Sequence, residues 1–499
     1  MLQYLDLDKL KLLFVYDKSD PLVFTSSLFL SVFFVLLLLH RLLYKSKPAR
    51  IYLLIIFSLF FYYKASGIYF LLLFVISFLN YFMGKWIATA QNSKTRFSLF
   101  LLALLLNIGI LIYFKYTNFF IQILNDIRGS AIAPMDIFLP LGISFILFKA
   151  LSYIIEIYLE NIQPVKSIRD FTLFIFYFPT LQLGPIERAS AFLPQVEQDN
   201  PLTKEIIGTA LFLIVSGLLK KVVIADYIGI NFVDRVFESP LRFTGVENLI
   251  AAYAYALQLY TDFSGYTDMA LGISLFLGYR LTNNFNSPFK ALSIADFWRR
   301  WHITLSSWCL DYIFKPLQIK FRGMNLFGNA LALFITFLVI GIWHGPSWTY
   351  IAFGAIHGIY LATSVFTKKQ RNKFYKKTNL TNSKAVKLLQ WFITFQFVVF
   401  AFIIFRSPGL PSAFNMLNQI FNFFHGEVFL QFVDGYKLIF ALILLGYLLH
   451  FLPEKFYDKL RLIIIGSPLL AKVAMLVVVI WIVIQFRFAD LQPFLYFKF

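Results

Sequence analysis

The sequence is poor in charged residues and contains a single cysteine, Cys309. Charged side chains make up 14% of its 499 residues, against about 25% in a soluble domain. The chain is instead 59% hydrophobic and 19% aromatic, with 62 Phe residues. One globular core cannot hide that much apolar surface, so the composition excludes an ordinary soluble protein. The lone cysteine excludes an intramolecular disulfide and a thiolate-rich metal site.

Several familiar catalytic signatures are also missing. The sequence has no G-x-x-x-x-G-K-[ST], H-E-x-x-H, C-x-x-C or G-x-S-x-G pattern, so nothing indicates nucleotide hydrolysis, zinc peptidase, redox or serine hydrolase chemistry. His302, His344 and His357 are candidate metal ligands, but no carboxylates accompany them at a matched spacing, and we expect no metal. Asp6 and Asp8 lie where a signal peptide would carry basic residues, so we expect no signal peptide.

Acidic residues are scarce relative to basic ones. The 45 Lys and Arg against 26 Asp and Glu give a net charge of +19, which in a soluble protein would point to nucleic acid. Here the basic residues fall between apolar blocks, where they indicate topology, so we expect membrane lipid and no nucleic acid as partner. Basic clusters at 41–50, 85–96 and 368–377 are predicted to face the cytoplasm.

Long apolar blocks predict an all-α polytopic integral membrane protein, because a hydrocarbon layer needs about 20 apolar residues per helix. Two short or tilted spans are expected around Lys64, and the basic stretch 368–387 is predicted to be a loop. Pro and Gly at 140–142 and 178–185 predict broken, re-entrant or interfacial helices. The blocks lie at 22–39, 51–84, 97–114, 136–159, 171–183, 207–219, 248–278, 327–343, 348–366, 388–405, 436–452 and 462–486.

Ionisable and amide side chains collect within this apolar chain at 258–358. Charged groups at membrane depth are costly, so they usually face a water-filled or reactive interior. A helix over 296–308 would pair Asp296 with Arg300 and present a tryptophan-rich face beside His302. The same face is equally typical of an interfacial helix anchored by its tryptophans.

His344 ends a mostly apolar run and is followed by Gly345 and Pro346. A lone buried histidine is more often a hydrogen-bonded structural residue than a catalytic one. However, an ordinary pKa of about 6.5 also suits histidine to proton transfer. From the residues alone, both interpretations of His344 stay open.

Six ordered motifs carry a family resemblance: PLGISF at 140–145, GPIER at 184–188, DFSGYTD at 262–268, NFNSP at 284–288, DFWRRWHITL at 296–305 and WHG at 343–345. Together they resemble the membrane-bound O-acyltransferase (MBOAT) family, in particular its bacterial branch of alginate and peptidoglycan O-acetyltransferases. The teichoic-acid D-alanyl transfer protein is a related member of the family. The resemblance runs from about residue 137 to the C-terminus.

The resemblance implies a ring of tilted helices around a central funnel, with an acyl donor entering from the cytoplasm and an acceptor approaching from outside. His344 matches the hallmark histidine of the family, and His302 matches the second histidine of this branch. The implied substrate contacts lie in the same motifs, at Asp262, Ser264, Tyr266, Asn284, Asn286, Trp298, Arg299, Arg300 and Trp343. Burial in such a funnel would keep an imidazole in its neutral, basic form.

The C-terminal FLYFKF at 494–499 resembles the tail of the same branch, in which Tyr496 would be a catalytic acyl relay. The alternative is an aromatic anchor at the membrane interface. Two departures weaken the carry-over. The segment 311–320 lacks the Gly-Gly-Asn-Arg found in relatives, and Lys149 and Glu156 replace Gln and Asp. Lys149, Ser152, Tyr153 and Glu156 share a helical face, so we expect them to line the interior.

We therefore expect a single MBOAT-type membrane domain over 1–499, with N-terminal transmembrane helices at 1–136, a motif-bearing core at 137–366 and C-terminal helices with the tail at 367–499. The expected activity is O-acyl transfer in the bacterial cytoplasmic (inner) membrane, with acetyl-CoA or an acyl carrier protein as thioester donor and no bound cofactor. An extracytoplasmic acyltransferase or polysaccharide-modifying partner would complete the transfer. The alternatives are a carrier-fed D-alanyl or other acyl transferase of the cell envelope, and a transporter or flippase.

Overall fold

The computed structural model describes residues 13–18, 21–198, 201–381, 383–486 and 494–495. These residues form helices and loops with no strand among them, which confirms the all-α polytopic membrane fold. Within the described ranges, seven helices are long and apolar enough to cross a membrane. A further pair, Gly426–Gly435 and Lys437–Phe451, meets at 97° and forms a broken span or a re-entrant loop.

Packing divides the chain into two compact units. The first contains the described residues of Met1–Leu218, Tyr266–Thr282 and Leu460–Lys498, and the second contains Leu219–Gly265 and Asn283–Lys459. Two helices contribute to both units, α11 (Gly245–Phe276) and α21 (Glu454–Gly466).

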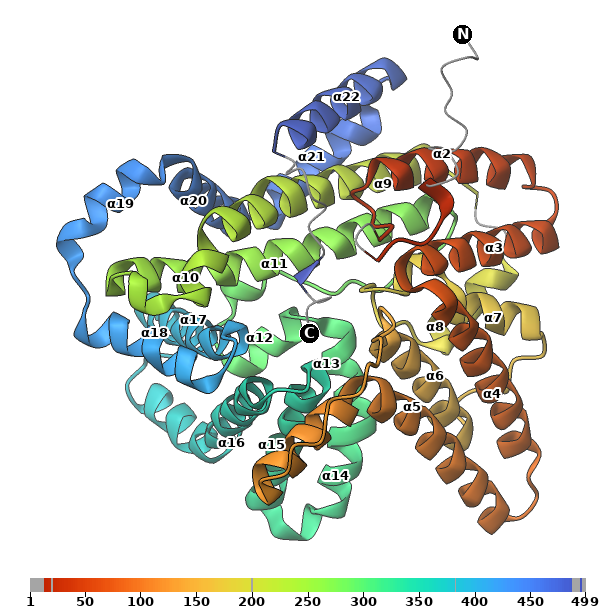
Figure 1. The fold of residues 1–499 in the computed structure, drawn as a ribbon, viewed down its shortest axis with the longest axis horizontal. Helices are drawn as coiled ribbons and strands as arrows, with labels where there is room; N and C mark the ends of the chain where they lie inside the picture. The colour runs from red at the N-terminus through yellow and green to blue at the C-terminus, as the bar shows by residue number, and fades with distance from the viewer. Residues whose placement is uncertain (1–12, 19–20, 199–200, 382, 487–493, 496–499) are drawn as a thin grey trace. The chain divides into compact units, whose positions relative to one another are not determined.

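The first unit is built mainly from N-terminal helices, among which α4, α5 and α6 pack side by side (Figure 1). Its helices are α2 (Ser27–Leu42), α3 (Lys47–Ser66), α4 (Phe70–Thr89), α5 (Ser93–Arg128), α6 (Ile143–Tyr158), α7 (Ile168–Phe176), α8 (Ala189–Glu197), α9 (Lys204–Leu218) and α22 (Leu469–Phe486).

The second unit contains α15 and α16, two long helices that pack along each other as an antiparallel hairpin (Figure 1). Beyond a π-helical stretch at Leu219–Asp226, its helices are α10 (Asp234–Glu238), α12 (Ile294–Arg300), α13 (Ile303–Cys309), α14 (Lys315–Lys320), α15 (Asn325–His344), α16 (Trp348–Lys377), α17 (Lys384–Arg406), α18 (Leu410–Asn422), α19 (Phe429–Gly435) and α20 (Lys437–Phe451).

The interruptions expected from Pro and Gly are present. α6 begins only after Gly142, whose φ of 71° places it in the left-handed region, and a Cβ on this residue would lie 1.9 Å from the Leu181 carbonyl oxygen. Only glycine fits both conditions. The second interruption, between α7 and α8, contains a 3-10 turn, Phe178–Thr180, followed by an irregular segment. These breaks are buried in protein, where their polar groups can be satisfied.

Around Lys64 the chain forms two helices, α3 and α4, separated by the short turn Gly67–Tyr69. Together they make up one of the seven candidate spans, Lys47–Thr89, so the two separate spans stay a prediction. The Lys64 side chain is buried, and its Nζ donates to the Val15 carbonyl at 2.7 Å. The carbonyl oxygen thus gives the lysine amine a hydrogen-bond partner that its apolar neighbours in the sequence cannot supply.

Two expected elements differ from the structure. The stretch 368–377, predicted to be a loop, forms the last turns of α16, because Lys, Arg and Gln are good helix formers once the chain leaves the apolar layer. The helix expected over 296–308 is broken at Trp301 and His302 into α12 and α13. The predicted pairing of Asp296 with Arg300 is retained, at 3.1 Å.

Two fully buried amides join the spanning helices α4 and α5. Asn80 Nδ2 donates to Asn107 Oδ1 at 3.0 Å, and Asn107 Nδ2 donates back at 2.9 Å. Replacing Asn80 by leucine is expected to lower the free energy of unfolding by about 1–2 kcal/mol, because it leaves the buried Asn107 amide oxygen without its donor. Denaturation by SDS in mixed micelles measures this loss.

The control is a double-mutant cycle. Asn80→Leu/Asn107→Leu should be destabilised by less than the sum of the two single variants, since it removes both polar groups together. Additive losses would contradict an interaction between the two amides.

Candidate active site

A loop and two short helices build the centre of the site. The Asn286 N–H donates to the Arg300 carbonyl at 2.9 Å, and the Ile303 N–H donates to the Asn284 carbonyl at 2.9 Å. The fully buried Asn284 side chain accepts from the Thr304 N–H at 3.2 Å and from its hydroxyl at 2.6 Å. This loop therefore holds the backbone on both sides of the break between α12 and α13.

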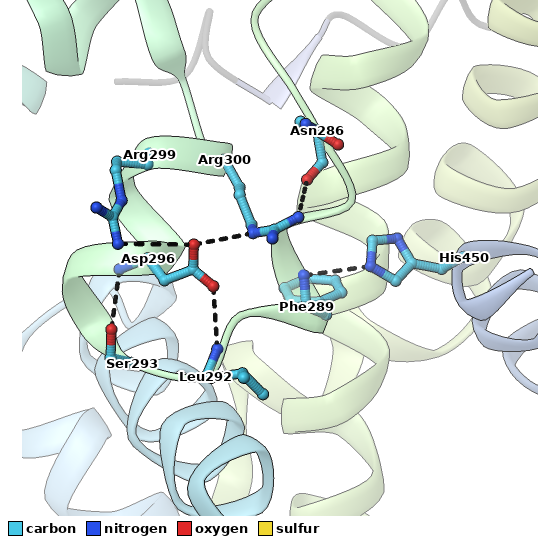
Figure 2. Close-up of polar contacts among 8 residues, drawn as sticks. All are labelled: Asn286, Phe289, Leu292, Ser293, Asp296, Arg299, Arg300 and His450. Atoms are coloured by element: carbon cyan, nitrogen blue, oxygen red, sulfur yellow. Dashed lines mark hydrogen bonds and ion pairs between the residues drawn. The ribbon is translucent and has the colours of Figure 1, made fainter. Parts of the chain in front are cut away.

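Figure 2 shows how α12 is fixed to the same loop. Arg300 Nε donates to the Asp296 carboxylate at 3.1 Å, and its Nη1 donates to the Asn286 carbonyl at 3.3 Å. The Asp296 N–H donates to the Ser293 hydroxyl at 3.1 Å as an N-cap, and the carboxylate accepts from the Leu292 N–H at 3.2 Å. Asp296 and Arg300 thus act as braces for the loop rather than as solvated charges.

His302 lies at the break and has φ 44° and ψ 54°. This left-handed conformation is uncommon for a non-glycine residue, and strain of this kind concentrates at functional sites. The imidazole is fully buried, with its ring 4.7 Å from Phe263 and 6.0 Å from Trp343, edge to face in both cases. Burial lowers the pKa of His302 to about 3, so the ring is neutral at neutral pH.

His344 is the last residue of α15 and is 3% exposed. Its ring lies 5.1 Å from Phe405 and 5.9 Å from Phe353, again edge to face. Gly345 follows because a Cβ there would lie 2.5 Å from the ring of Tyr350. The WHG motif is therefore the place where α15 ends against the aromatic wall of α16 and α17.

The two histidines come together around one indole. The Trp343 ring is 6.0 Å from His302 and 5.1 Å from His344, and all three side chains are buried. The structure therefore unites in one aromatic, water-poor environment two imidazoles that lie 42 positions apart in the sequence. Such surroundings favour the neutral form of histidine, which can take a proton from a hydroxyl.

The sequence analysis missed the importance of His357. This residue of α16 is fully buried, and its Nδ1 accepts from Trp298 Nε1 at 3.2 Å. Its ring is also 4.6 Å from Phe353, which contacts His344. His357 thus orients Trp298 through this hydrogen bond, and through Phe353 it supports the position of His344. The sequence signal for its burial was its position one helical turn after the apolar Phe353.

Asp262 lies in a buried ion cluster. The Lys221 Nζ is 2.6 Å from Asp262 Oδ1 and 2.7 Å from Asp226 Oδ1, and the side chains of Lys221 and Asp262 are each 1% exposed. Sequence reasoning did not single out Lys221, although a lysine in an apolar run must find a partner. Lys221 is thus a structural counter-ion for Asp262. The residue after Asp262 is Phe263, whose ring contacts His302.

The other predicted residues are more dispersed. Ser264 is buried, and its hydroxyl makes no hydrogen bond within the part of the chain described. Tyr266 belongs to the first unit, where its ring stacks on Phe24 at 4.7 Å and meets the buried Phe494 edge-on at 4.7 Å. Arg299 has a side chain that is 74% exposed. Tyr496 lies outside the described residues.

The predicted polar face of α6 is largely buried in the first unit. Lys149 Nζ donates to the Phe174 and Ile175 carbonyls and to the Thr180 hydroxyl, at 3.0–3.1 Å, and so caps the end of α7. The buried Glu187 of the GPIER motif accepts from Thr282. Burial raises the pKa of Glu187 to about 7, against the opposing effects of Thr282 and Lys149.

Comparison with known proteins agrees with the motifs. The family model described as MBOAT, membrane-bound O-acyltransferase family, matches residues 57–407. A peptidoglycan O-acetyltransferase of Helicobacter pylori is 36% identical over 365 residues, 68% of this chain and 67% of that protein. A probable alginate O-acetylase of Azotobacter vinelandii is 34% identical over 410 residues, 81% of this chain and 78% of that protein. A teichoic acid D-alanyltransferase of Bacillus subtilis is 32% identical over 283 residues, 55% of this chain and 70% of that protein.

Proposed function

The chain belongs to the membrane-bound O-acyltransferase family, and from that premise we propose that it moves an acetyl group from a cytoplasmic thioester donor across the bacterial inner membrane toward an extracytoplasmic polysaccharide. The observation that carries the proposal is the buried cluster of His302, Trp343 and His344. Acetyl rather than another acyl group is proposed because the relatives matched over two thirds or more of this chain are named O-acetyltransferase or O-acetylase.

The chemistry requires one base. As an acceptor oxygen attacks the thioester carbonyl, a C–O bond forms, the C–S bond breaks, and the hydroxyl proton moves to the neutral imidazole of His344. The imidazolium then returns that proton to the departing thiolate, which restores the base. His302 would orient the acceptor, share the proton or polarise the carbonyl.

Tyr496 is proposed as the first acceptor. Its phenol, with an ordinary pKa of about 10, needs an adjacent base to act as a nucleophile. Phe494, two residues earlier in the chain, is buried against Tyr266. The tyrosyl ester would then pass its acetyl group to an extracytoplasmic partner protein or directly to the polysaccharide.

The test incubates the full chain in nanodiscs with acetyl-CoA that carries a radiolabelled acetyl group. We expect the wild type to release coenzyme A and to retain label on the chain, whereas Tyr496→Phe should retain none, because it lacks the hydroxyl. Tyr113→Phe, a change of the same kind at a half-exposed tyrosine of α5, should label like the wild type. Equal labelling of Tyr496→Phe would disprove the relay.

A second function has its own support. The exposed Lys320 and Arg322, next to the half-exposed Lys315, lie just before α15. Because α15 and α16 form an antiparallel hairpin, these cations are on the same side as the basic end of α16, which is predicted to be cytoplasmic. An acidic acyl carrier protein could dock there, as a D-alanyl transferase would require. Failure of acetyl-CoA to label the wild type would make this the leading proposal.

A further inference from the structure

A cavity of about 130 Å³ lies in the first unit between the end of α2, the start of α3 and the end of α11. This is well above the volume of about 10–15 Å³ that holds one water. Its lining combines cationic and aromatic side chains with apolar ones. The lining residues are Leu37, His40, Arg41, Tyr44, Arg50, Leu202, Phe276, Leu277 and Gly278.

The cations of this cavity are arranged around one ring. The guanidinium carbons of Arg41 and Arg50 lie 5.3 Å and 5.1 Å from the centre of the Tyr44 ring. The Tyr44 ring therefore attracts both guanidinium groups and keeps them next to the cavity, although their like charges repel each other. Lys47 and Arg50 also line an adjoining cleft, so the positive charge continues beyond the cavity.

His40 makes the cavity more than a basic surface patch. It is 8% exposed, lines the cavity, and makes no hydrogen bond to another residue within the described ranges. An imidazole N–H could therefore donate to an anion in the cavity. Because α2 and α3 enclose this site at the 41–50 basic cluster, it faces the predicted cytoplasmic side.

We propose that this cavity binds the phosphate ester of an amphiphilic molecule. Two guanidinium groups supply forked, charge-assisted donors that match phosphate oxygens, and the imidazole supplies a third donor. Leu37, Phe276 and Leu277 offer an apolar wall to the part of the ligand next to the phosphate. Two sources carry this chemistry at a cytoplasmic face: the head group of an anionic phospholipid and coenzyme A. The site does not depend on the proposed acyl transfer.

Native mass spectrometry of the full chain in detergent tests the site with two probes, short-chain phosphatidylglycerol and coenzyme A. We expect one of them to bind the wild type and to bind Arg41→Gln/Arg50→Gln at least about tenfold more weakly, because two charge-assisted hydrogen-bonding groups are lost. Binding of the lipid alone identifies a head-group site, and binding of coenzyme A alone identifies a coenzyme A site. Short-chain diacylglycerol, which lacks the phosphate, should not bind.

The matched control removes two charges from the other cluster on the same face, as Lys85→Gln/Lys94→Gln. This variant should bind like the wild type, and an equal loss would show attraction to charge in general and overturn the site. Tyr44→Leu keeps every cation but removes the ring, so it should weaken binding even if the double arginine variant fails to fold. Absence of binding to the wild type by either probe, or unchanged binding in Tyr44→Leu, would also overturn the proposal.

Discussion

Replacing His344 by alanine is expected to reduce the turnover of labelled acetyl-CoA by about 10²–10⁴-fold, the range that a lost general base typically costs. The loss should fall mainly on kcat, because the proton is transferred in the transition state rather than on binding. Initial rates of coenzyme A release in nanodiscs measure the effect.

The control is His450→Gln. His450 is 6% exposed, and its Nε2 accepts from the Phe289 N–H at 3.2 Å, a bond that a glutamine oxygen can retain. This variant should keep near wild-type turnover, so that general loss of a buried histidine is separated from loss of the base. Retention of activity in His344→Ala would disprove its catalytic role.

His302→Gln separates the roles left open for the second histidine. Glutamine can donate and accept hydrogen bonds but cannot carry the proton, so retained turnover would assign His302 to orientation or polarisation. A loss as large as that of His344→Ala would assign it to proton sharing. The two single losses should not add in the double variant if the histidines act as one unit.

The spans were predictable because apolar blocks of membrane length leave a chain few alternatives. α3 and α4 form in the apolar block around Lys64, and Gly142 marks the start of α6. The break at His302 was not predictable in the same way. No glycine or proline directly precedes it. Its cause is the pairing of Asn286 with Arg300 and of Asn284 with Ile303, partners that lie 14 and 19 positions apart in the sequence.

Motifs located His302 and His344, but only the structure places both against Trp343. Sequence spacing does not distinguish the polar motif residues that lie beside His302, Trp343 and His344 from those that only stabilise the fold. Asp262 illustrates the difference, because its motif suggested a substrate contact whereas its carboxylate lies against Lys221. Side-chain partners far apart in sequence are set by tertiary packing, which periodicity does not encode.

Replacing Lys221 by methionine is therefore expected to destabilise the protein strongly, by about 3–5 kcal/mol, because it leaves the buried Asp262 carboxylate and the half-buried Asp226 carboxylate without their counter-ion. Lys221 Nζ lies 2.6 Å from Asp262 and 2.7 Å from Asp226, and neither the lysine nor Asp262 is accessible to water. SDS denaturation in mixed micelles gives the free energy of unfolding. Turnover should also fall, since Phe263 beside Asp262 contacts His302.

Lys220→Met is the matched control, because Lys220 is the adjacent residue, is only half-buried and has its Nζ 5.9 Å from the centre of the Tyr260 ring. It should lose far less stability than Lys221→Met. The apolar triple variant Lys221→Met/Asp226→Leu/Asp262→Leu should recover most of the lost stability, since replacing a whole buried ion cluster avoids its desolvation cost. If the triple variant regains stability but not turnover, the ion cluster is needed to position α11 beside His302. If Lys221→Met is as stable as Lys220→Met, the ion cluster does not stabilise the fold.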